Sequence, residues 1–307
     1  GFCTFMLNIN MLKKKYSIIH FNNIPNFLVL SAIIPKILGS KVILDIHDLF
    51  PEMCMEKFGL PSNHYLIKFL FLEERISIYF ADKIIVTNRL HIDRLRHNII
   101  SEKDFSIVLN GADEEIFPPF SNHNFNEKKV IIIFPSTISK RLGIDLLIES
   151  IDILSKKRDD FILKIFGDGE FKDELKQLLN DKQMENIVYL SNSFVDFDVL
   201  NEEYEKSHIG VIPWCKGPST NLQMPNKIHE YFIKSLCVVA PDLEIIKVYF
   251  NNIVAMFKAG DPNSLANTLD LLIRDRNLMK SYSQQGFEFA LKHSWQYYKN
   301  VYQAIIS

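Results

Sequence analysis

The sequence predicts an α/β protein of two domains, each built from a parallel sheet with helices packed on it. Short apolar runs recur along the chain, and segments with helical periodicity lie between them. The length of 307 residues also exceeds what a single hydrophobic core usually fills. We therefore expect two doubly wound domains that face a cleft, with ligands bound at the carboxyl ends of the strands.

In the first part of the chain, four apolar runs are typical of strands. Amphipathic segments between them predict helices, among them residues 65–80 and 91–97. Prolines and small polar residues in 117–129 predict a linker. We expect a first domain over residues 1–120 and a linker over 121–129. The predicted strands are residues 17–21, 41–46, 83–87 and 106–109.

A second alternating series follows the linker and predicts a domain over residues 130–292. Helices are expected at 143–154 and 170–179 within it. An aromatic-rich helix at 294–306 ends the chain, and we assign residues 293–307 to a crossover helix. The predicted strands are residues 130–134, 161–166, 187–190, 209–213, 238–240 and 253–257.

Composition excludes several classes of protein. The 35 basic and 37 acidic residues leave a formal net charge of −2 without a polybasic arm, which argues against nucleic acid as a partner. No apolar run is long enough to cross a bilayer. The chain begins with Gly1, so we expect that its natural beginning is absent. The cysteines lack C-x-x-C spacing, which favours a reducing compartment over a zinc or disulfide framework; they are Cys3, Cys54, Cys215 and Cys237.

Polar side chains follow the predicted strand at residues 41–46. His47 and Asp48 come directly after it, and Glu52 lies four residues after Asp48. A histidine and two carboxylates at a strand end suit acid–base work or the orientation of hydroxyl groups. The alternative is that Asp48 caps a turn and His47 makes a local hydrogen bond.

Gly167, Asp168 and Gly169 follow the predicted strand at residues 161–166. Glycines allow the backbone to approach a ligand closely. The third glycine of a dinucleotide-binding fingerprint is missing, and the motif lies in the middle of the chain. A plain strand-to-helix turn explains these residues equally well.

The segment at residues 224–231 is the most informative one. Pro225 suits the first position of a helix, and the N–H groups of such a helix end attract phosphate. Lys227 and Glu230 share one helical face, where an ammonium group suits a phosphate and a carboxylate suits a ribose diol. An ordinary surface ion pair is the alternative.

Two further pairs of charged residues follow strands of the second series. Lys140 and Arg141 come after its first strand, where an arginine can bind a diphosphate through two parallel hydrogen bonds. A solvated loop charge is the alternative. Asp196 and Asp198 match the D-x-D pattern of some metal–nucleotide sites, but their place before an apolar run favours helix capping.

Together these segments resemble the retaining group 1 glycosyltransferases of the GT-B fold, which has two Rossmann-like domains. The resemblance extends from about residue 15 to residue 307 and depends on the order and spacing of the segments. The segments that carry it are residues 42–52, 107–113, 136–145, 167–169 and 224–231.

The resemblance implies a role for each candidate residue. His47 would face the transferred sugar, and the terminal helix would cross back onto the first domain. Arg141 would contact the donor diphosphate with help from Lys227, while Glu230 would hold the donor ribose. The expected donor-binding residues are Lys140, Arg141, Gly167, Lys227 and Glu230.

Three features depart from the family pattern. Leu222 stands where an E-x7-E pair would place an acid, although relatives with a P-x-K-x-x-E-Y motif often lack that acid too. Leu142 replaces the usual lysine before Gly143, which leaves the cation role to Arg141 or Lys140. Nothing before Lys15 matches the family's first strand and glycine-rich acceptor loop. We therefore expect an incomplete N-terminal domain and no sugar transfer by the chain as given.

The resemblance implies transfer of a sugar, with retention, from a nucleotide-sugar donor to a glycan or polyprenyl-linked acceptor in bacterial envelope polysaccharide synthesis. The leaving diphosphate would accept the acceptor's proton, and its charge would be stabilised by Arg141 and Lys227. No metal or other cofactor is expected. The expected location is cytoplasmic, at the inner face of the membrane. A peripheral membrane contact through residues 65–80 is an option, although core packing explains their apolar character as well.

Other functions stay open at this stage. Truncation could leave an inactive module that binds a nucleotide sugar. A GT-B sugar-nucleotide 2-epimerase would need additional acidic and histidine residues in the cleft. An NAD-dependent oxidoreductase has only Gly167, Asp168 and Gly169 in its favour.

Overall fold

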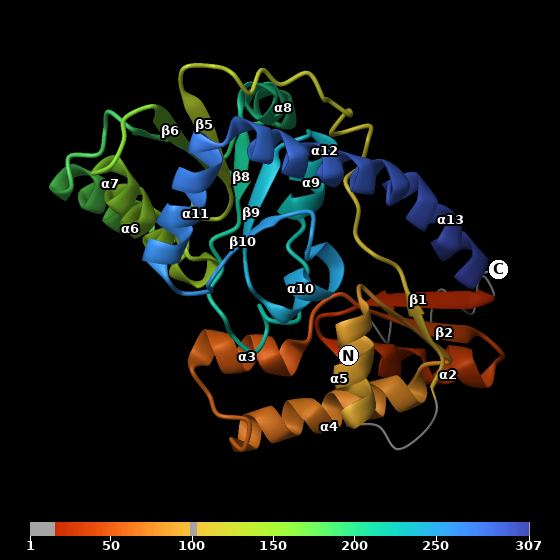
Figure 1. The fold of residues 1–307 in the computed structure, drawn as a ribbon. Helices are drawn as coiled ribbons and strands as arrows, with labels where there is room; N and C mark the ends of the chain where they lie inside the picture. The colour runs from red at the N-terminus through yellow and green to blue at the C-terminus, as the bar shows by residue number, and fades with distance from the viewer. Residues whose placement is uncertain (1–15, 99–102, 307) are drawn as a thin grey trace. The chain divides into compact units, whose positions relative to one another are not determined.

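The computed structural model describes residues 16–98 and 103–306, which divide into two compact units (Figure 1). The first and longest segment of unit 1 ends at Leu109, and the unit also includes two later segments, Gly217–Met224 and Tyr298–Ser307. Unit 2 consists of Asn110–Lys216 and Pro225–Tyr297. Cys3 and the segment before Lys15 lie outside the described residues.

Unit 1 contains a parallel sheet of four strands in the order β1-β2-β3-β4. The strands are β1 (Ile18–Asn22), β2 (Lys41–Ile46), β3 (Lys83–Val86) and β4 (Phe105–Ile107). The helices are η1 (Asn26–Ala32), α2 (Ile33–Ile37), α3 (Phe50–Phe58), α4 (Tyr65–Phe80), α5 (Arg89–His97) and the last part of α13 (Trp295–Ile306).

The two faces of this sheet differ in chemistry because successive side chains of a strand point to opposite sides. Val42, Leu44 and Ile46 of β2 belong to the buried apolar cluster formed with η1, α4 and α5. The alternate positions of β1 and β2 include His20 and Asp45, which bond to each other. The sheet therefore has one apolar face and one face with a polar network.

Unit 2 contains a parallel sheet of six strands in the order β10-β9-β8-β5-β6-β7. The strand order reverses between β5 and β8, which is the place where open α/β sheets bind ligands. The strands are β5 (Val130–Pro135), β6 (Phe161–Phe166), β7 (Val188–Leu190), β8 (Ile209–Val211), β9 (Cys237–Pro241) and β10 (Ala255–Phe257).

Helices accompany the strands of unit 2. Leu147, Ile148 and Ile151 of α6 are fully buried in its apolar core, as the helical periodicity of that segment predicts. The helices are η2 (Lys140–Leu142), α6 (Ile144–Ser155), α7 (Lys172–Asp181), α8 (Phe197–Lys206), α9 (Lys227–Ile233), α10 (Glu244–Phe250), α11 (Pro262–Arg274) and α12 (Arg276–Lys292).

The predicted parallel α/β class is confirmed by both sheets. Every predicted strand is present with its ends within two residues of the predicted ones, and α4 has its predicted bounds. Among the described residues, no helix combines the length and apolarity that a bilayer crossing needs.

Candidate functional site

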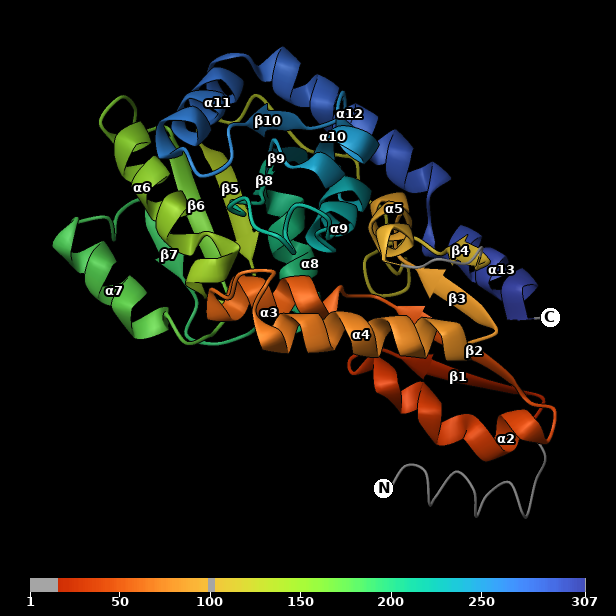
Figure 2. The same ribbon diagram turned by 90° about the horizontal axis from the view of Figure 1, so that it is seen from below.

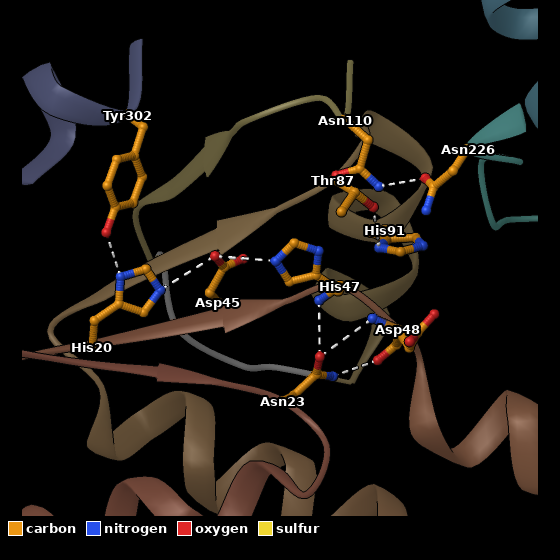
Figure 3. A network of polar contacts seen from close by, with 10 residues as sticks. All are labelled: His20, Asn23, Asp45, His47, Asp48, Thr87, His91, Asn110, Asn226 and Tyr302. Atoms are coloured by element: carbon orange, nitrogen blue, oxygen red, sulfur yellow. Dashed lines mark hydrogen bonds and ion pairs between the residues drawn. The ribbon is translucent and has the colours of Figure 1, made fainter. Parts of the chain in front are cut away.

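Polar side chains gather where β1 and β2 of unit 1 end (Figure 3). Asn23 follows β1, and His47 and Asp48 follow β2. The amide oxygen of Asn23 accepts a hydrogen bond from the His47 backbone N–H at 2.9 Å, while its Nδ2 donates to the Asp48 carbonyl at 2.6 Å. One side chain from the neighbouring strand thus holds the backbone on which His47 sits.

The His47 ring belongs to a chain of four side chains (Figure 3). Oδ2 of Asp45 lies 3.3 Å from Nε2 of His47 and 3.2 Å from Nε2 of His20. Nδ1 of His20 lies 2.6 Å from the hydroxyl of Tyr302 on α13. The ionised Asp45 carboxylate therefore bridges two imidazoles, and the C-terminal helix secures the outer one.

These contacts assign the ring protons. An ionised carboxylate only accepts hydrogen bonds, so Nε2 of both His20 and His47 must carry a proton. In a neutral imidazole the other nitrogen is an acceptor, so the Tyr302 hydroxyl donates to Nδ1 whenever His20 is neutral. None of the described residues bonds to Nδ1 of His47, whose side chain is 44% exposed. The nitrogen that His47 can offer to a ligand is Nδ1.

The network shifts the acidity of its members. Burial alone would raise the pKa of Asp45, but the hydrogen bonds from His20 and His47 lower that pKa to about 2. The bond to Asp45 raises the pKa of His47 and outweighs the opposing effect of burial. At a pH near neutrality, His47 therefore carries a proton more often than an isolated histidine does.

The carboxylates predicted next to His47 are both engaged by other side chains. Oδ1 of Asp48 accepts a hydrogen bond from Nε2 of Gln223 at 2.6 Å, and the N-cap residue of α3 is Leu49. Glu52 is buried and paired with Arg94, with Nη2 of Arg94 2.7 Å from its Oε2. This ion pair gives Glu52 a structural contact, and an acid–base role for it stays a hypothesis.

The segment 217–224 folds into unit 1 and contributes to this strand-end region. Leu222, at the position where a family acid was expected, packs against the apolar cluster of the sheet. Its carbonyl accepts from Nδ2 of Asn88 at 3.1 Å. Oε2 of Glu56 accepts from the backbone N–H groups of Ser219 and Thr220 at 3.1 and 3.2 Å.

In unit 2, Lys140 and Arg141 lie in η2, which follows β5 after the loop of residues 136–139. Strand β5 borders the reversal of strand order. Both side chains are exposed, and Nζ of Lys140 lies 4.8 Å from the centre of the Phe171 ring. Gly143 follows with a φ of +78°, and a Cβ there would lie 1.9 Å from the carbonyl oxygen of Pro213. Only glycine fits where the loops after β5 and β8 meet.

Gly167 and Gly169 serve the packing of two loops. A Cβ on Gly167 would lie 1.9 Å from the carbonyl oxygen of Ser136, and one on Gly169 would lie 2.4 Å from that of Ile138. The backbone N–H of Gly167 donates to Oγ of Ser191 at 3.0 Å. The glycines thus allow the loops after β5 and β6 to touch, and the role of Gly167 in donor binding stays a prediction.

Lys227 and Glu230 form an ion pair on α9, with Nζ 2.9 Å and 3.1 Å from the two carboxylate oxygens. The hydroxyl of the fully buried Tyr204 donates to Oε2 of Glu230 at 2.7 Å. Glu230 is therefore held in place from the core, while Lys227 is about one third exposed. The helix begins at Lys227, so the predicted start at Pro225 is wrong.

The turn before α9 contains Asn226, whose Oδ1 accepts from Nδ2 of Asn110 at 2.8 Å (Figure 3). Asp196 occupies the N-cap of α8, although its side chain makes no capping hydrogen bond, and Asp198 lies in the first turn. Both places suit a carboxylate at the positive end of a helix. In the part of the chain that the structure describes, no three or more His, Cys, Asp or Glu side chains form a cluster that could hold a metal ion.

Sequence reasoning missed His20, Asn23, Asp45 and Tyr302. His20 and Asp45 interrupt apolar strand runs, a signal that could have marked the polar face of the sheet. The pairing with Tyr302 left no local signal. The expected set also divides between the units: His47 lies in unit 1, whereas Lys140, Arg141, Gly167, Lys227 and Glu230 lie in unit 2.

Comparisons with known proteins extend these observations. A family model described as "Glycosyl transferases group 1" matches residues 118–289, more than half of the chain. An uncharacterized glycosyltransferase of Methanocaldococcus jannaschii is 26% identical over 83% of this chain and 72% of its own length. The HepE protein of Anabaena, solved in complex with UDP, has 13% identity and a TM-score of 0.74 over 98% of this chain and 82% of its own.

A relative from Campylobacter jejuni is 27% identical over 55% of this chain. It is named N-acetylgalactosamine-N,N'-diacetylbacillosaminyl-diphospho-undecaprenol 4-alpha-N-acetylgalactosaminyltransferase. The match covers 44% of that protein.

Proposed function

Because the chain belongs to the group 1 glycosyl transferases, we propose that the active enzyme moves a sugar from a nucleotide-sugar donor to a glycan or polyprenyl-linked acceptor with retention. The observation that carries the proposal is the Glu230 carboxylate, which Tyr204 and Lys227 hold in one orientation beside the start of α9. UDP in the Anabaena structure and the undecaprenol in the name of the Campylobacter relative support the donor and acceptor classes.

The donor would bind to unit 2. Arg141 offers a planar guanidinium that can bind a diphosphate through two parallel hydrogen bonds, and Lys140 adds a second exposed cation. The ammonium group of Lys227 has three N–H donors, so it can contact phosphate without leaving Glu230. Glu230 has about four lone-pair sites, of which Lys227 and Tyr204 use three, and the remainder suits a ribose hydroxyl.

His47 would act on the transferred sugar through Nδ1. Asp45 fixes the proton on Nε2, so neutral His47 accepts a hydrogen bond from a sugar hydroxyl, and protonated His47 donates one. The leaving diphosphate would take the proton of the acceptor hydroxyl. Arg141 and Lys227 would stabilise its growing negative charge, so we expect no requirement for a metal or other cofactor.

The proposed setting is envelope polysaccharide synthesis at the cytoplasmic face of a bacterial membrane. The acceptor class supports it, because a polyprenyl-linked acceptor is held at a bilayer. The chain itself contributes exposed apolar side chains on unit 1, such as Phe69 and Leu72.

Calorimetric titration with a panel of nucleoside diphosphates tests the donor site. Glu230→Gln is expected to weaken binding by about 1–3 kcal/mol, the usual loss for a hydrogen bond to a charged group. Glu185→Gln, at an exposed position of the same unit, is the matched control. Equal affinity in wild type and Glu230→Gln would remove Glu230 from the site, and binding without transfer would favour the inactive-module alternative.

A further inference from the structure

Helix α4 presents an apolar stripe to solvent. Its inner side buries Ile67, Leu70 and Ile78 against the rest of unit 1. The outer side carries large apolar residues at alternating spacings of four and three, which keeps them on one helical face. These residues are between 37% and 79% exposed; they are Tyr65, Phe69, Leu72, Ile76 and Tyr79.

Large apolar side chains are exposed on other elements of unit 1 as well. Helix α4 packs against η1, which continues into α2 (Figure 2), and both η1 and α2 carry exposed apolar residues. Of the 22 large hydrophobic side chains that are exposed in the described residues, 12 lie between residues 27 and 79. A soluble surface rarely concentrates so much apolar area without a partner. The exposed residues of this group outside the stripe are Phe27, Ile33, Ile34, Ile37, Leu38, Phe58 and Leu66.

The charges beside the stripe are positive. Lys68 and Arg75 lie seven residues apart on the same side of α4, and Arg75 lies over the ring of Tyr79 at 5.8 Å. Arg75 is half-buried and Lys68 is exposed. Of the two glutamates of the helix, Glu74 is buried in an ion pair with Arg94, and the half-buried Glu73 accepts a hydrogen bond from Nδ2 of Asn26. The outer face of α4 therefore combines apolar side chains with cations.

We propose that this α4 outer face, made of Tyr65, Lys68, Phe69, Leu72, Arg75, Ile76 and Tyr79, binds the surface of an anionic lipid bilayer. Amphipathic helices with a basic rim lie in the headgroup region of such membranes. Lysine and arginine extend their charged ends toward lipid phosphates while their stems stay on apolar surface. Tyr65 and Tyr79 place aromatic rings with a polar tip at the two ends of the helix, as membrane interfaces favour.

Charge decides between a bilayer and a second copy of the chain. A two-fold dimer uses the same patch on both subunits. If two copies paired through antiparallel α4 helices, Lys68 and Arg75 of one copy would lie close to Lys68 and Arg75 of the other. Like charges at such a seam are destabilising. An anionic bilayer attracts the same two cations and accepts the apolar stripe.

The biological meaning of this contact rests on the proposed function, because it would bring the enzyme to an acceptor held in the bilayer. The contact itself requires no transfer activity. Vesicle binding and nucleotide binding can therefore be measured separately, and the failure of one does not imply the failure of the other.

Co-sedimentation of the full chain with phosphatidylglycerol–phosphatidylcholine vesicles tests the proposal against vesicles of phosphatidylcholine alone. Each basic residue near an anionic surface contributes about fivefold in partitioning, so Lys68→Gln/Arg75→Gln should bind anionic vesicles about 30-fold more weakly. Leu72→Ser/Ile76→Ser should lower binding at least about tenfold through lost apolar contact. Raised salt should weaken wild-type binding and leave the charge-neutralised variant nearly unaffected.

Matched controls come from exposed positions of unit 2. Lys128→Gln/Lys129→Gln and Leu271→Ser/Leu291→Ser change the same residue types and should bind vesicles as the wild type does. Unchanged thermal unfolding of all variants would show that the fold is intact, since every substituted side chain faces solvent or is only half-buried. Equal vesicle binding by wild type and α4 variants would overturn the proposal. The proposal would also be overturned if the wild type sedimented as a dimer and did not bind vesicles, while Leu72→Ser/Ile76→Ser sedimented as a monomer.

Discussion

Replacing Asp45 by asparagine tests the network around His47 most directly. The hydrogen bonds from His20 and His47 lower the pKa of Asp45 from 3.8 to about 2. A shift of that size corresponds to about 2.5 kcal/mol of stability at neutral pH. The side chain is only 12% exposed, so solvent screens little of this interaction. Asp45→Asn should therefore lower the free energy of unfolding by about 2 kcal/mol at pH 7.

The pH dependence of this loss has a definite sign. A depressed carboxyl pKa contributes stability that is present above pH 3.8 and disappears as the pH falls toward about 2. The raised pKa of His47 contributes stability below pH 6.5, which is lost as the pH rises through the folded-state pKa. Asp45→Asn removes both contributions, so wild type and variant should converge in stability only at strongly acidic pH.

The direct assay is an NMR titration of the imidazole nitrogens, with the His47 signals assigned by their loss in His47→Gln. Wild-type His47 should show a proton on Nε2 and a pKa above 6.5, while Asp45→Asn should lower this pKa and mix the tautomers. Asp93→Asn, at an exposed aspartate of α5, is the matched control. A wild-type His47 protonated on Nδ1 in its neutral form, or an unchanged pKa in Asp45→Asn, would refute the reasoning.

Three further predictions concern the proposed reaction. Transfer by the active enzyme should survive EDTA, since Arg141 and Lys227 would supply the positive charge; activity that is lost with EDTA and restored by Mg²⁺ or Mn²⁺ would contradict this. Arg141→Ala should reduce turnover more than nucleotide affinity, because the negative charge of the leaving group grows in the transition state. Steady-state kinetics measures the turnover and calorimetry the affinity, and equal losses in both would contradict this prediction. His47→Ala should reduce turnover and leave the affinity for free nucleotide nearly intact, whereas a matching loss of affinity would assign His47 to the nucleotide site or to the fold.

Local patterns were sufficient to locate the strands of both sheets. The alternation of apolar runs with helical periodicity located both sheets. A buried strand appears in the sequence as an apolar run, and a helix with one buried face appears as a helical repeat of apolar residues. The start of α9 was mistaken because Pro225 is compatible with a helix start and also with the preceding turn. Here its carbonyl accepts from the Ile228 N–H at 3.1 Å, and the helix begins at Lys227.

Spacing within one helix also predicted a contact, since residues three apart must share a face: Lys227 and Glu230 pair as their positions require. That Tyr204 holds Glu230 from the core depends on how α8 packs beside α9, and spacing along the chain does not contain this information.

The sequence by itself determined the fold class, the strand end that precedes His47, the segment after β5 that contains Arg141, and the family resemblance. Only the tertiary structure decided what surrounds His47. His20 and Asp45 stand 25 residues apart, and His20 and Tyr302 stand 282 apart, yet they form one chain of hydrogen bonds. The parallel pairing of β1 with β2 and the return of the C-terminal helix bring them together. Such long-range contacts follow from packing of the whole unit, which local propensity and periodicity do not encode.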